Sequence, residues 1–304
     1  MFSNYLKIAW RNITRQKLYS LINITGLATG LAVCMLIMLY VAHEMSYDRF
    51  HKNADRMFVP NIQLRFNGTP VTLGEQSYVT GPLLKQNQPA VEAYMRVLAY
   101  FRPIVAYNPA VANQKFSESK LLFADPAFFN FFSFKLLSGR ALDVLKQPFS
   151  VVISRDMAKK YFGTENPVGK TLTIKTDSAY TYHITGVAEN SPSNSSVTFN
   201  FVASAASLLT MKEASNYVGP NQIGGGTFDT YLLLKHAGDT AALSRNLQRT
   251  AKKTSDANSE HFSFLPFTGV HLHNYNGSSN IKSVSYTHLR AHETPEPSRM
   301  PSSA

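Results

Sequence analysis

The stretch LYSLINITGLATGLAVCMLIMLYVAH, residues 18–43, decides the fold class, because it contains no Asp, Glu, Lys or Arg and no proline. As a helix rising about 1.5 Å per residue, it reaches about 39 Å, more than the roughly 30 Å hydrocarbon core of a bilayer. From Gly26 to Ala42 only Thr29 and Tyr40 are polar, so the helix has no hydrophilic face. We predict a transmembrane helix over residues 18–43.

A cleaved signal peptide is the alternative interpretation of this stretch. Against it are the long segment that precedes the apolar run, the length of the run itself, and the lack of an A-x-A-like cleavage site before Met45. A buried helix in a soluble core fits less well again, because the run is too long and too apolar.

The flanks of the span predict its orientation. The preceding segment has no acidic residue and four basic ones: Lys7, Arg11, Arg15 and Lys17. Acidic and basic residues balance one another just after His43. Because the basic flank of a span stays in the cytoplasm, we expect the N-terminus inside the cell and everything after His43 outside the membrane.

Residues 1–17 have the pattern of an amphipathic helix. Its apolar positions share one face, and Lys7, Arg11 and Arg15 recur every four residues on the other. We expect this helix to lie on the cytoplasmic membrane surface with its basic residues, Lys17 included, toward anionic lipid headgroups. A plain helical extension of the span remains the alternative.

Within the span, Gly26 and Gly30 form a G-x-x-x-G pair. Small residues at this spacing let helix backbones approach closely, so we expect a helix-packing face here, although glycine is common in membrane helices in general. Cys34 is the one cysteine of the chain and lies in the span, so an intrachain disulfide is excluded.

The composition favours a globular domain outside the membrane. The 304 residues are 44% hydrophobic and carry a net charge of +11. The basic residues are dispersed, without a Lys/Arg-rich run or an aromatic RNA-binding motif, so we do not expect nucleic-acid binding.

Short strands alternate with short helices from residue 44 to 283, which predicts a mixed α+β domain of two lobes. The clearest unit has a strand at Ser150–Ile153, an N-cap at Ser154, a helix at Arg155–Phe162 and Gly163 as its C′ residue. We further expect strands at Met57–Phe66 and Thr198–Phe201, and helices at Leu83–Gln88 and Ala203–Met211. The aromatic run near Phe128–Phe134 is expected to be core rather than a ligand cage.

Two patterns imitate functional sites. GTENPVGKT, residues 163–171, resembles a phosphate-binding loop, but Thr164 occupies a required glycine position and a helix precedes the loop where a strand is needed. His271 and His273 flank Leu272 without a nearby third metal ligand, so a surface turn is expected. No catalytic motif stands out, and we expect neither an enzyme nor a bound cofactor or metal.

Several segments, in this order and spacing, resemble the MacB/FtsX-like permeases of ABC transporters. NYLKIAWRNITRQKLYSLINITGLATGLA (4–32) resembles the cytoplasmic lead-in and first transmembrane helix, and HEMSYDRFHKNADRMF (43–58) the chain's emergence into the periplasm. Pieces of the periplasmic core domain are similar to FFNFFSFKLLSGR (128–140), SVVISRDMAKKYFGTENPVGKTL (150–172) and ITGVAENSPSNSSVTFNF (184–201). PFTGVHLH (266–273) resembles the segment before the second transmembrane helix.

The resemblance implies a four-helix permease of the bacterial inner membrane, homodimeric or heterodimeric, whose periplasmic domain lies between helices 1 and 2. A partner ATPase on the cytoplasmic side would supply the energy for export or release of a substrate, and a periplasmic accessory protein could join. A single-span anchored sensor or binding module is the alternative.

The C-terminal segment departs from the family pattern. From Lys282 onward the sequence is polar where a second span is expected, and SYTHLRAHETPE (285–296) resembles a translated sequencing adapter. We therefore expect a truncated permease that ends in an artefactual tail at residues 284–304, with a genuine disordered tail as the alternative.

Overall fold

The computed structural model describes residues 2–66, 69–100, 104–108, 115–212, 226–254 and 261–272. By its internal contacts the chain forms two units, Met1–Ser46 and Tyr47–Ala304. The predicted tail lies outside the described residues.

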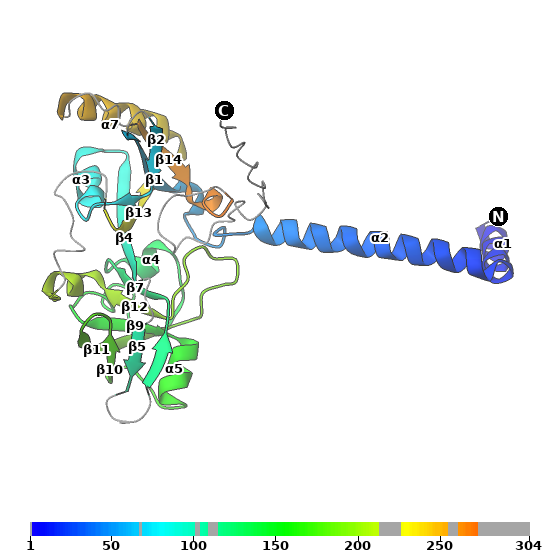
Figure 1. The fold of residues 1–304 in the computed structure, drawn as a ribbon, viewed down its shortest axis with the longest axis horizontal. Helices are drawn as coiled ribbons and strands as arrows, with labels where there is room; N and C mark the ends of the chain where they lie inside the picture. Colours follow the sequence, from blue (N-terminus) through cyan, green and yellow to red (C-terminus); the bar gives the residue numbers. More distant parts are fainter. Residues whose placement is uncertain are drawn as a thin grey trace, which may run out of the picture. The chain divides into compact units, whose positions relative to one another are not determined.

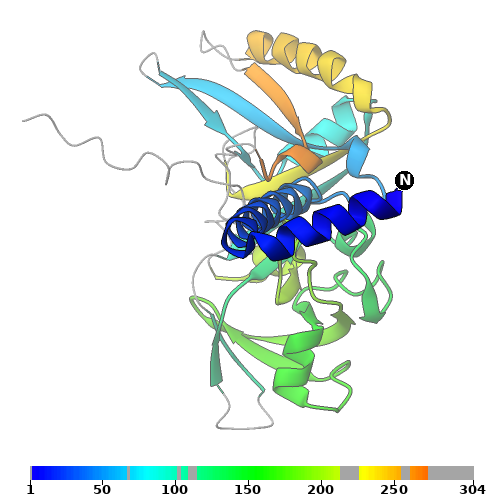
Figure 2. The same ribbon diagram turned by 90° about the vertical axis from the view of Figure 1, so that its right-hand side faces the viewer.

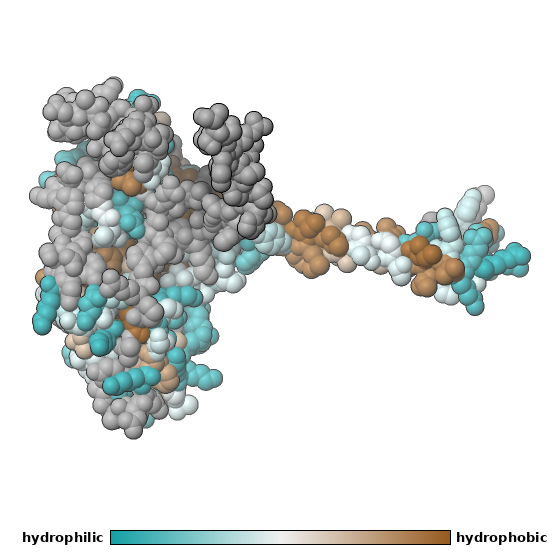
Figure 3. All heavy atoms as spheres, viewed as in Figure 1, coloured by the Kyte–Doolittle hydropathy of each residue, from teal (hydrophilic) through white to brown (hydrophobic). Residues whose placement is uncertain are grey.

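The first unit consists of two helices, α1 (Phe2–Arg15) and α2 (Lys17–Glu44). Between them Gln16 leaves helical geometry, with φ −111° and ψ 61°, and the helices run in different directions from this residue (Figure 1 and Figure 2). No residue of α2 is buried, and its surface is largely apolar (Figure 3). By length and composition, α2 is the single described helix that could cross a membrane.

The second unit is built on one mixed sheet, which Figure 1 shows running from α7 at the top to α5 at the bottom. The described strands follow the order β14-β1-β13-β4-β7-β12-β9-β11-β10-β5-β6, and β2, β3 and β8 attach to β1, β13 and β11. The pairs β11–β9 and β12–β7 are parallel, and the other described pairs are antiparallel.

The bounds of the strands are β1 (Met57–Phe66), β2 (Thr69–Leu73), β3 (Glu75–Gln76), β4 (Val91–Tyr100), β5 (Ile104–Tyr107), β6 (Lys115–Glu118), β7 (Leu121–Ala124), β8 (Leu136–Ser138), β9 (Ser150–Ser154), β10 (Thr171–Lys175), β11 (Ala179–Ala188), β12 (Phe201–Ser204), β13 (Phe228–Leu234) and β14 (His261–Pro266). The helices of this unit are α3 (Thr80–Asn87), α4 (Phe128–Phe131), α5 (Arg155–Phe162) and α7 (Thr240–Thr254). Short 3-10 turns are η1 (Ala54–Arg56), η2 (Ala205–Thr210), η3 (Ala237–Asp239) and η4 (Phe267–Gly269).

Strand β4 joins the two ends of the sheet. Its residues from Val91 to Val97 pair with β13, and those from Val97 to Tyr100 pair with β7. We call the strands on the β13 side (β1, β2, β3, β13 and β14) the upper half, and those from β7 to β6 the lower half. One continuous sheet connects these halves within a single unit, and the division into two lobes stays a prediction.

Side chains alternate between the two faces of the sheet, as the pleat of a strand requires. On one face a shared core runs through both halves; it includes Met57, Met95, Val97, Leu122, Val202 and Tyr231 and the five phenylalanines between 128 and 134. The expectation that this aromatic run is core is confirmed, since each of those rings is buried.

The opposite face carries two separate cores. The lower core includes Leu98, Phe123, Ile153, Tyr182 and Phe228. The upper core includes Phe58, Leu84, Leu232, Leu243 and Leu247, so α3 and α7 cover it.

A polar break separates these two cores. Arg96 lies on β4 between Tyr94, which packs on the upper core, and Leu98 of the lower core. Its guanidinium donates to both carboxylate oxygens of Asp125, with Nε–Oδ2 at 2.9 Å and Nη2–Oδ1 at 2.7 Å. Burial opposes the charge on Arg96, but the hydrogen bonds and charge of Asp125 outweigh it, so the pKa of Arg96 is raised.

The predicted strand–helix unit around Ser154 is confirmed. Ser154 caps α5 by accepting a hydrogen bond from the Met157 N–H at 3.4 Å, and Gly163 ends the helix with φ 60°. The helix is tied to β6 because Lys160 Nζ and Tyr161 Oη donate to Glu118 Oε1 at 2.7 and 2.9 Å.

Three predicted elements differ from the structure. Helix α3 begins at Thr80 rather than Leu83. The strand predicted at Thr198–Phe201 is β12 at Phe201–Ser204, and the helix predicted at Ala203–Met211 is the 3-10 turn η2. Backbone pairing of β12 with both β7 and β9 explains the shift, because it draws Ala203 and Ser204 into the sheet.

Candidate functional site

The second unit begins with an anchor segment, Tyr47–Arg56, which follows the end of α2 in sequence. Asp48 is fully buried and has a left-handed backbone, φ 58°, which is uncommon for a residue with a side chain. Its N–H donates to the Asn194 carbonyl at 3.0 Å, and its Oδ1 accepts from the Ser196 N–H at 2.8 Å. These bonds fix the beginning of the segment to the loop between β11 and β12.

His51 fixes the segment a second time. Its Nδ1 bonds to the carbonyl oxygen of Phe132, and because a carbonyl can only accept, the proton is on Nδ1. The ring lies among Phe132, Phe134 and Phe267, with centroids 5.4 to 5.6 Å away. Its Nε2 lies 3.7 Å from Asp48 Oδ1, and both side chains are fully buried. The segment is therefore bound to the loop between β7 and β8 as well.

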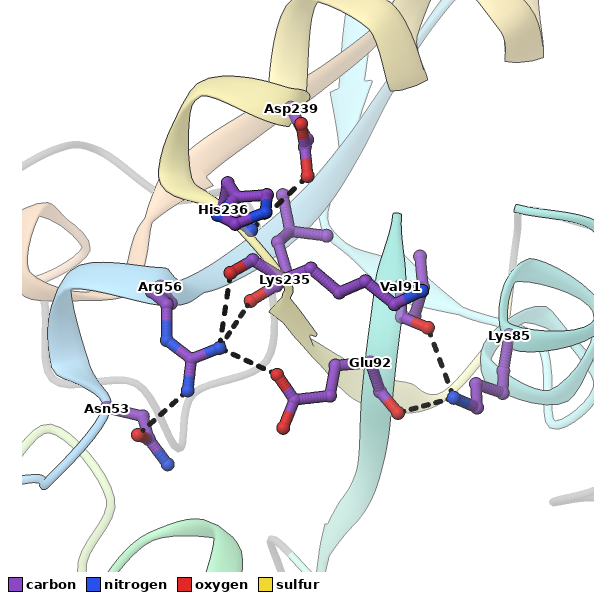
Figure 4. Close-up of polar contacts among 9 residues, drawn as sticks. Asn53, Arg56, Lys85, Val91, Glu92, Lys235, His236 and Asp239 are labelled. Atoms are coloured by element: carbon purple, nitrogen blue, oxygen red, sulfur yellow. Dashed lines mark hydrogen bonds and ion pairs between the residues drawn. The ribbon is translucent and has the colours of Figure 1, made fainter. Parts of the chain in front are cut away.

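Arg56 binds the end of the segment to the upper half. Figure 4 shows its guanidinium between Glu92 of β4 and the end of β13. Nη1 donates to Glu92 Oε2 at 2.6 Å and to the Leu234 carbonyl at 3.0 Å, and Nη2 donates to Asn53 Oδ1 at 3.0 Å. The Arg56 and Glu92 side chains are 28% and 46% exposed, so this contact lies at the rim of the domain.

The contacts around Arg56 extend into neighbouring elements (Figure 4). Lys85 of α3 donates through Nζ to the carbonyls of Val91 and Glu92, and the His236 N–H donates to Asp239 Oδ2 at 3.2 Å just before α7. The end of the anchor segment therefore meets the same group of strands that α3 and α7 cover.

The anchor segment thus contacts both halves of the sheet within ten residues. Asp48 and His51 bind loops of the lower half, and Arg56 binds strands of the upper half. At the beginning of the segment, Tyr47 stacks on His271, with ring centroids 3.4 Å apart and planes 2° apart. A displacement of this segment would be passed to both halves through buried or partly buried contacts.

The predicted membrane residues lie in the first unit. Lys7, Arg11 and Arg15 are exposed on α1, and Lys17 is the exposed first residue of α2. A methyl group added at Gly26 or Gly30 would meet no atom within 4 Å, so this stretch of α2 has an open surface. Thr25 and Thr29 donate back to the carbonyls of Leu21 and Thr25 at 2.8 Å, which satisfies their hydroxyls within the helix.

The structure bears differently on the two sequence patterns that resemble functional sites, residues 163–171 and the pair His271 and His273. The phosphate-loop resemblance fails in the predicted way: α5 precedes the loop, β10 follows it, and Lys170 forms an ion pair with Glu165. The pair lowers the pKa of Glu165, first through the hydrogen bond and then through the charge of Lys170.

The histidine prediction is corrected, because the His271 side chain is buried against Tyr47 rather than exposed on a surface turn. His273 lies outside the described residues. Within the described part of the chain, no group of three or more His, Cys, Asp or Glu side chains could hold a metal ion.

Sequence reasoning did not find Asp48, His51 or Arg56 as functional residues. Most of their partners are distant in sequence: backbone atoms of Asn194, Ser196, Phe132 and Leu234, and the carboxylate of Glu92. The one available signal was the resemblance of residues 43–58 to a family segment.

The structure defines the class of the protein as a mixed α+β domain that follows one candidate membrane-spanning helix. The family described as "MacB-like periplasmic core domain" matches residues 20–250. The chain therefore belongs to this family of periplasmic domains of ABC-transporter permeases. No curated protein sequence matches it.

Three solved structures are similar to this chain. A domain described as part of a permease protein from Porphyromonas gingivalis superimposes with a TM-score of 0.59 at 24% identity, over 72% of this chain and 92% of that one. The periplasmic region of MacB from Actinobacillus actinomycetemcomitans has a TM-score of 0.45 at 16% identity, covering 67% and 87%. The extracellular domain of the ABC-type transporter YknZ from Gram-positive bacteria has 0.43 at 14%, covering 62% and 88%. The first of these three shares the fold of this domain.

Proposed function

We propose that this domain passes ATP-driven movement of the membrane helices to the periplasm, where it serves the export or release of a substrate. A partner ATPase on the cytoplasmic side supplies the energy, and this chain catalyses no reaction itself. The observation that carries the proposal is the anchor segment, which follows α2 directly and binds both halves of the sheet.

The anchor segment is suited to this role because Asp48 and His51 are buried and Arg56 is partly buried. A hydrogen bond to a buried charged group contributes about 1.5–3 kcal/mol. Asp48 has such a bond from the Ser196 N–H, and Arg56 adds partly exposed and therefore weaker bonds to a carboxylate and a carbonyl. A segment held in this way moves together with the loops and strands it binds.

Energy transfer between the domain and the membrane tests this proposal in the complete permease with its ATPase, reconstituted in nanodiscs. With Cys34 replaced by Ser, a donor dye on Lys159→Cys in the lower half or Gln86→Cys in the upper half reports distance to labelled lipid headgroups. We expect ATP to change the signal from both positions.

Asp48→Ala should reduce the change at Lys159→Cys, and Arg56→Met the change at Gln86→Cys, while ATP hydrolysis continues. Asp55→Asn, an exposed change within the same segment, is the matched control. An ATP response that survives in both variants would show that the segment is not the route.

We further propose that the N-terminus is cytoplasmic and that α1 lies on the membrane surface. The charge bias before α2 and the exposed basic residues Lys7, Arg11, Arg15 and Lys17 support this placement. Single cysteines at Lys135 and Asn4, in a Cys34→Ser background, test it. A membrane-impermeant thiol reagent applied to cells with a permeabilised outer membrane should label Lys135→Cys only, and the reverse pattern would invert the topology.

Gly26 and Gly30 are proposed to lie where another helix of a dimeric permease packs. Replacing both by Leu should leave insertion of α2 intact, since Leu favours the bilayer, but should weaken assembly by blocking close backbone approach. Co-purification of the permease and its ATPase measures this effect, with Leu27→Ala as a control. Unchanged co-purification would show that these glycines have no role in helix packing and only reflect the usual glycine content of membrane helices. A periplasmic accessory protein would be an additional partner.

A further inference from the structure

A polar pocket with a volume of about 230 Å³ lies beside the N-terminus of α5. The residues that line it come from the loop between β11 and β12, the start of α5 and the residue before β7. They are Lys120, Asp156, Asn190, Ser191, Pro192, Ser193, Thr198, Phe199 and Asn200.

Hydrogen bonds among the lining residues give the pocket a fixed shape. Asn190 Oδ1 accepts from the Asp156 N–H at 3.2 Å, and Ser191 Oγ accepts from the Phe199 N–H at 3.2 Å. Asn200 Nδ2 donates to the Ser119 carbonyl at 3.2 Å. The pocket is therefore built by its own walls rather than left open between mobile side chains.

Two opposite charges line the pocket without pairing. Within the described residues, neither the ammonium of Lys120 nor the carboxylate of Asp156 forms an ion pair. Lys120 also has a left-handed backbone, φ 62°, while its carbonyl accepts from the Asn200 N–H at 3.0 Å. Backbone strain of this kind is uncommon for a residue with a side chain and clusters at functional sites.

We propose that this pocket binds a small zwitterion, a free amino acid. Lys120 Nζ donates to the ligand's carboxylate, and the ligand's ammonium donates to the carboxylate of Asp156. The volume of about 230 Å³ is below the roughly 300–1,000 Å³ of sites for drug-sized ligands, which suits a small ligand such as an amino acid. The amide and hydroxyl lining serves the ligand's remaining polar atoms.

The same loop connects the pocket to the anchor segment. Asn190, Ser191 and Ser193 line the pocket, and three residues further on Ser196 donates its N–H to Asp48. Occupancy of the pocket therefore stiffens the contact that holds Asp48. This link rests on the function proposed above, whereas the binding itself does not.

Isothermal titration of the full chain in nanodiscs tests the binding, with L-alanine as the probe. We expect a dissociation constant on the order of 0.1–1 mM for so small a ligand. N-acetyl-L-alanine amide, which lacks both charges, should not bind. Lys120→Gln and Asp156→Asn should each weaken binding at least tenfold.

Lys159→Gln and Asp55→Asn, which remove the same charges outside the pocket, are the matched controls and should bind L-alanine normally. Equal binding of the capped compound, no binding up to 20 mM, or an equal loss in the controls would overturn the proposal. An unchanged thermal midpoint of each variant without ligand shows that it folds.

Hydrogen–deuterium exchange tests the link separately. L-alanine should slow exchange at the amides of Asp48 and Ser196, and should not do so in Lys120→Gln. Binding without this protection would remove the link to the anchor segment and leave the function proposed for that segment untouched.

Discussion

Arg96 and Arg56 each form an ion pair with a carboxylate of the same domain, but one pair is buried and the other is partly exposed. The Arg96 and Asp125 side chains are 8% and 12% exposed, and Arg96 also donates to the Tyr78 carbonyl at 2.7 Å and lies 3.9 Å from the Tyr78 ring centroid. The Arg56–Glu92 pair is at the rim and partly hydrated.

The difference is one of desolvation rather than of distance, because the closest contacts are 2.7 and 2.6 Å. A buried pair leaves an uncompensated charge when one partner is lost, whereas water replaces the lost partner of an exposed pair. The buried pair divides two cores, and the exposed pair fastens a segment to the surface.

The largest effect is expected from Asp125→Asn, which leaves Arg96 buried without its counter-charge. Such a loss costs about 3–5 kcal/mol. Urea unfolding followed by circular dichroism measures it. The double variant Arg96→Met/Asp125→Leu should recover much of the loss, because an apolar pair can replace a buried ion pair. A free energy of unfolding of Asp125→Asn within about 1 kcal/mol of the wild type would show that water reaches the Arg96–Asp125 pair.

An intermediate effect is expected at Tyr161, whose hydroxyl donates to the buried Glu118. Burial first, and then the hydrogen bond to Glu118, raise the pKa of Tyr161 above its ordinary value. Tyr161→Phe should cost about 1 kcal/mol at pH 7.

The raised pKa of Tyr161 also predicts how the effect of Tyr161→Phe changes with pH. A group with a raised pKa in the folded state stabilises the fold below its unfolded pKa, about 10 for tyrosine, and less as pH rises beyond it. The difference in unfolding free energy between wild type and Tyr161→Phe should therefore shrink above about pH 10. A difference that grows there would contradict the assignment.

The smallest effect is expected from Glu92→Gln at the rim. An exposed ion pair contributes about 0.2–1 kcal/mol, and salt screens it. We expect the loss measured by urea unfolding at low ionic strength to disappear at about 1 M salt. A loss of stability that does not depend on salt would show that the Arg56–Glu92 pair is as shielded from solvent as the Arg96–Asp125 pair, and the contrast between the two arginines would then be wrong.

Much of the fold was predictable where a local pattern decides the structure. The apolar span, the alternating strand Met57–Phe66 and the capped helix after Ser154 all have local signals, and each was found. The predicted class, an anchored mixed α+β domain, is confirmed. Strands β2 and β6 were missed, since Thr69–Leu73 and Lys115–Glu118 lack a clear alternation of apolar residues.

The candidate site was less predictable because its contacts are long-range. Asp48 meets Ser196, and His51 meets Phe132, through backbone atoms that carry no residue-specific signal. The polar break had no signal either: Arg96 in an apolar strand gives no indication of Asp125, 29 residues later, as its partner. The membrane placement of α1 and the packing role of Gly26 and Gly30 stay predictions.

The stacking of Tyr47 on His271 has a consequence for how such a domain could spread among proteins. Residues that open and nearly close the described fold lie with ring centroids 3.4 Å apart. A chain that leaves one place and returns to it can be inserted into a short connection of a host protein with little cost in loop-closure entropy.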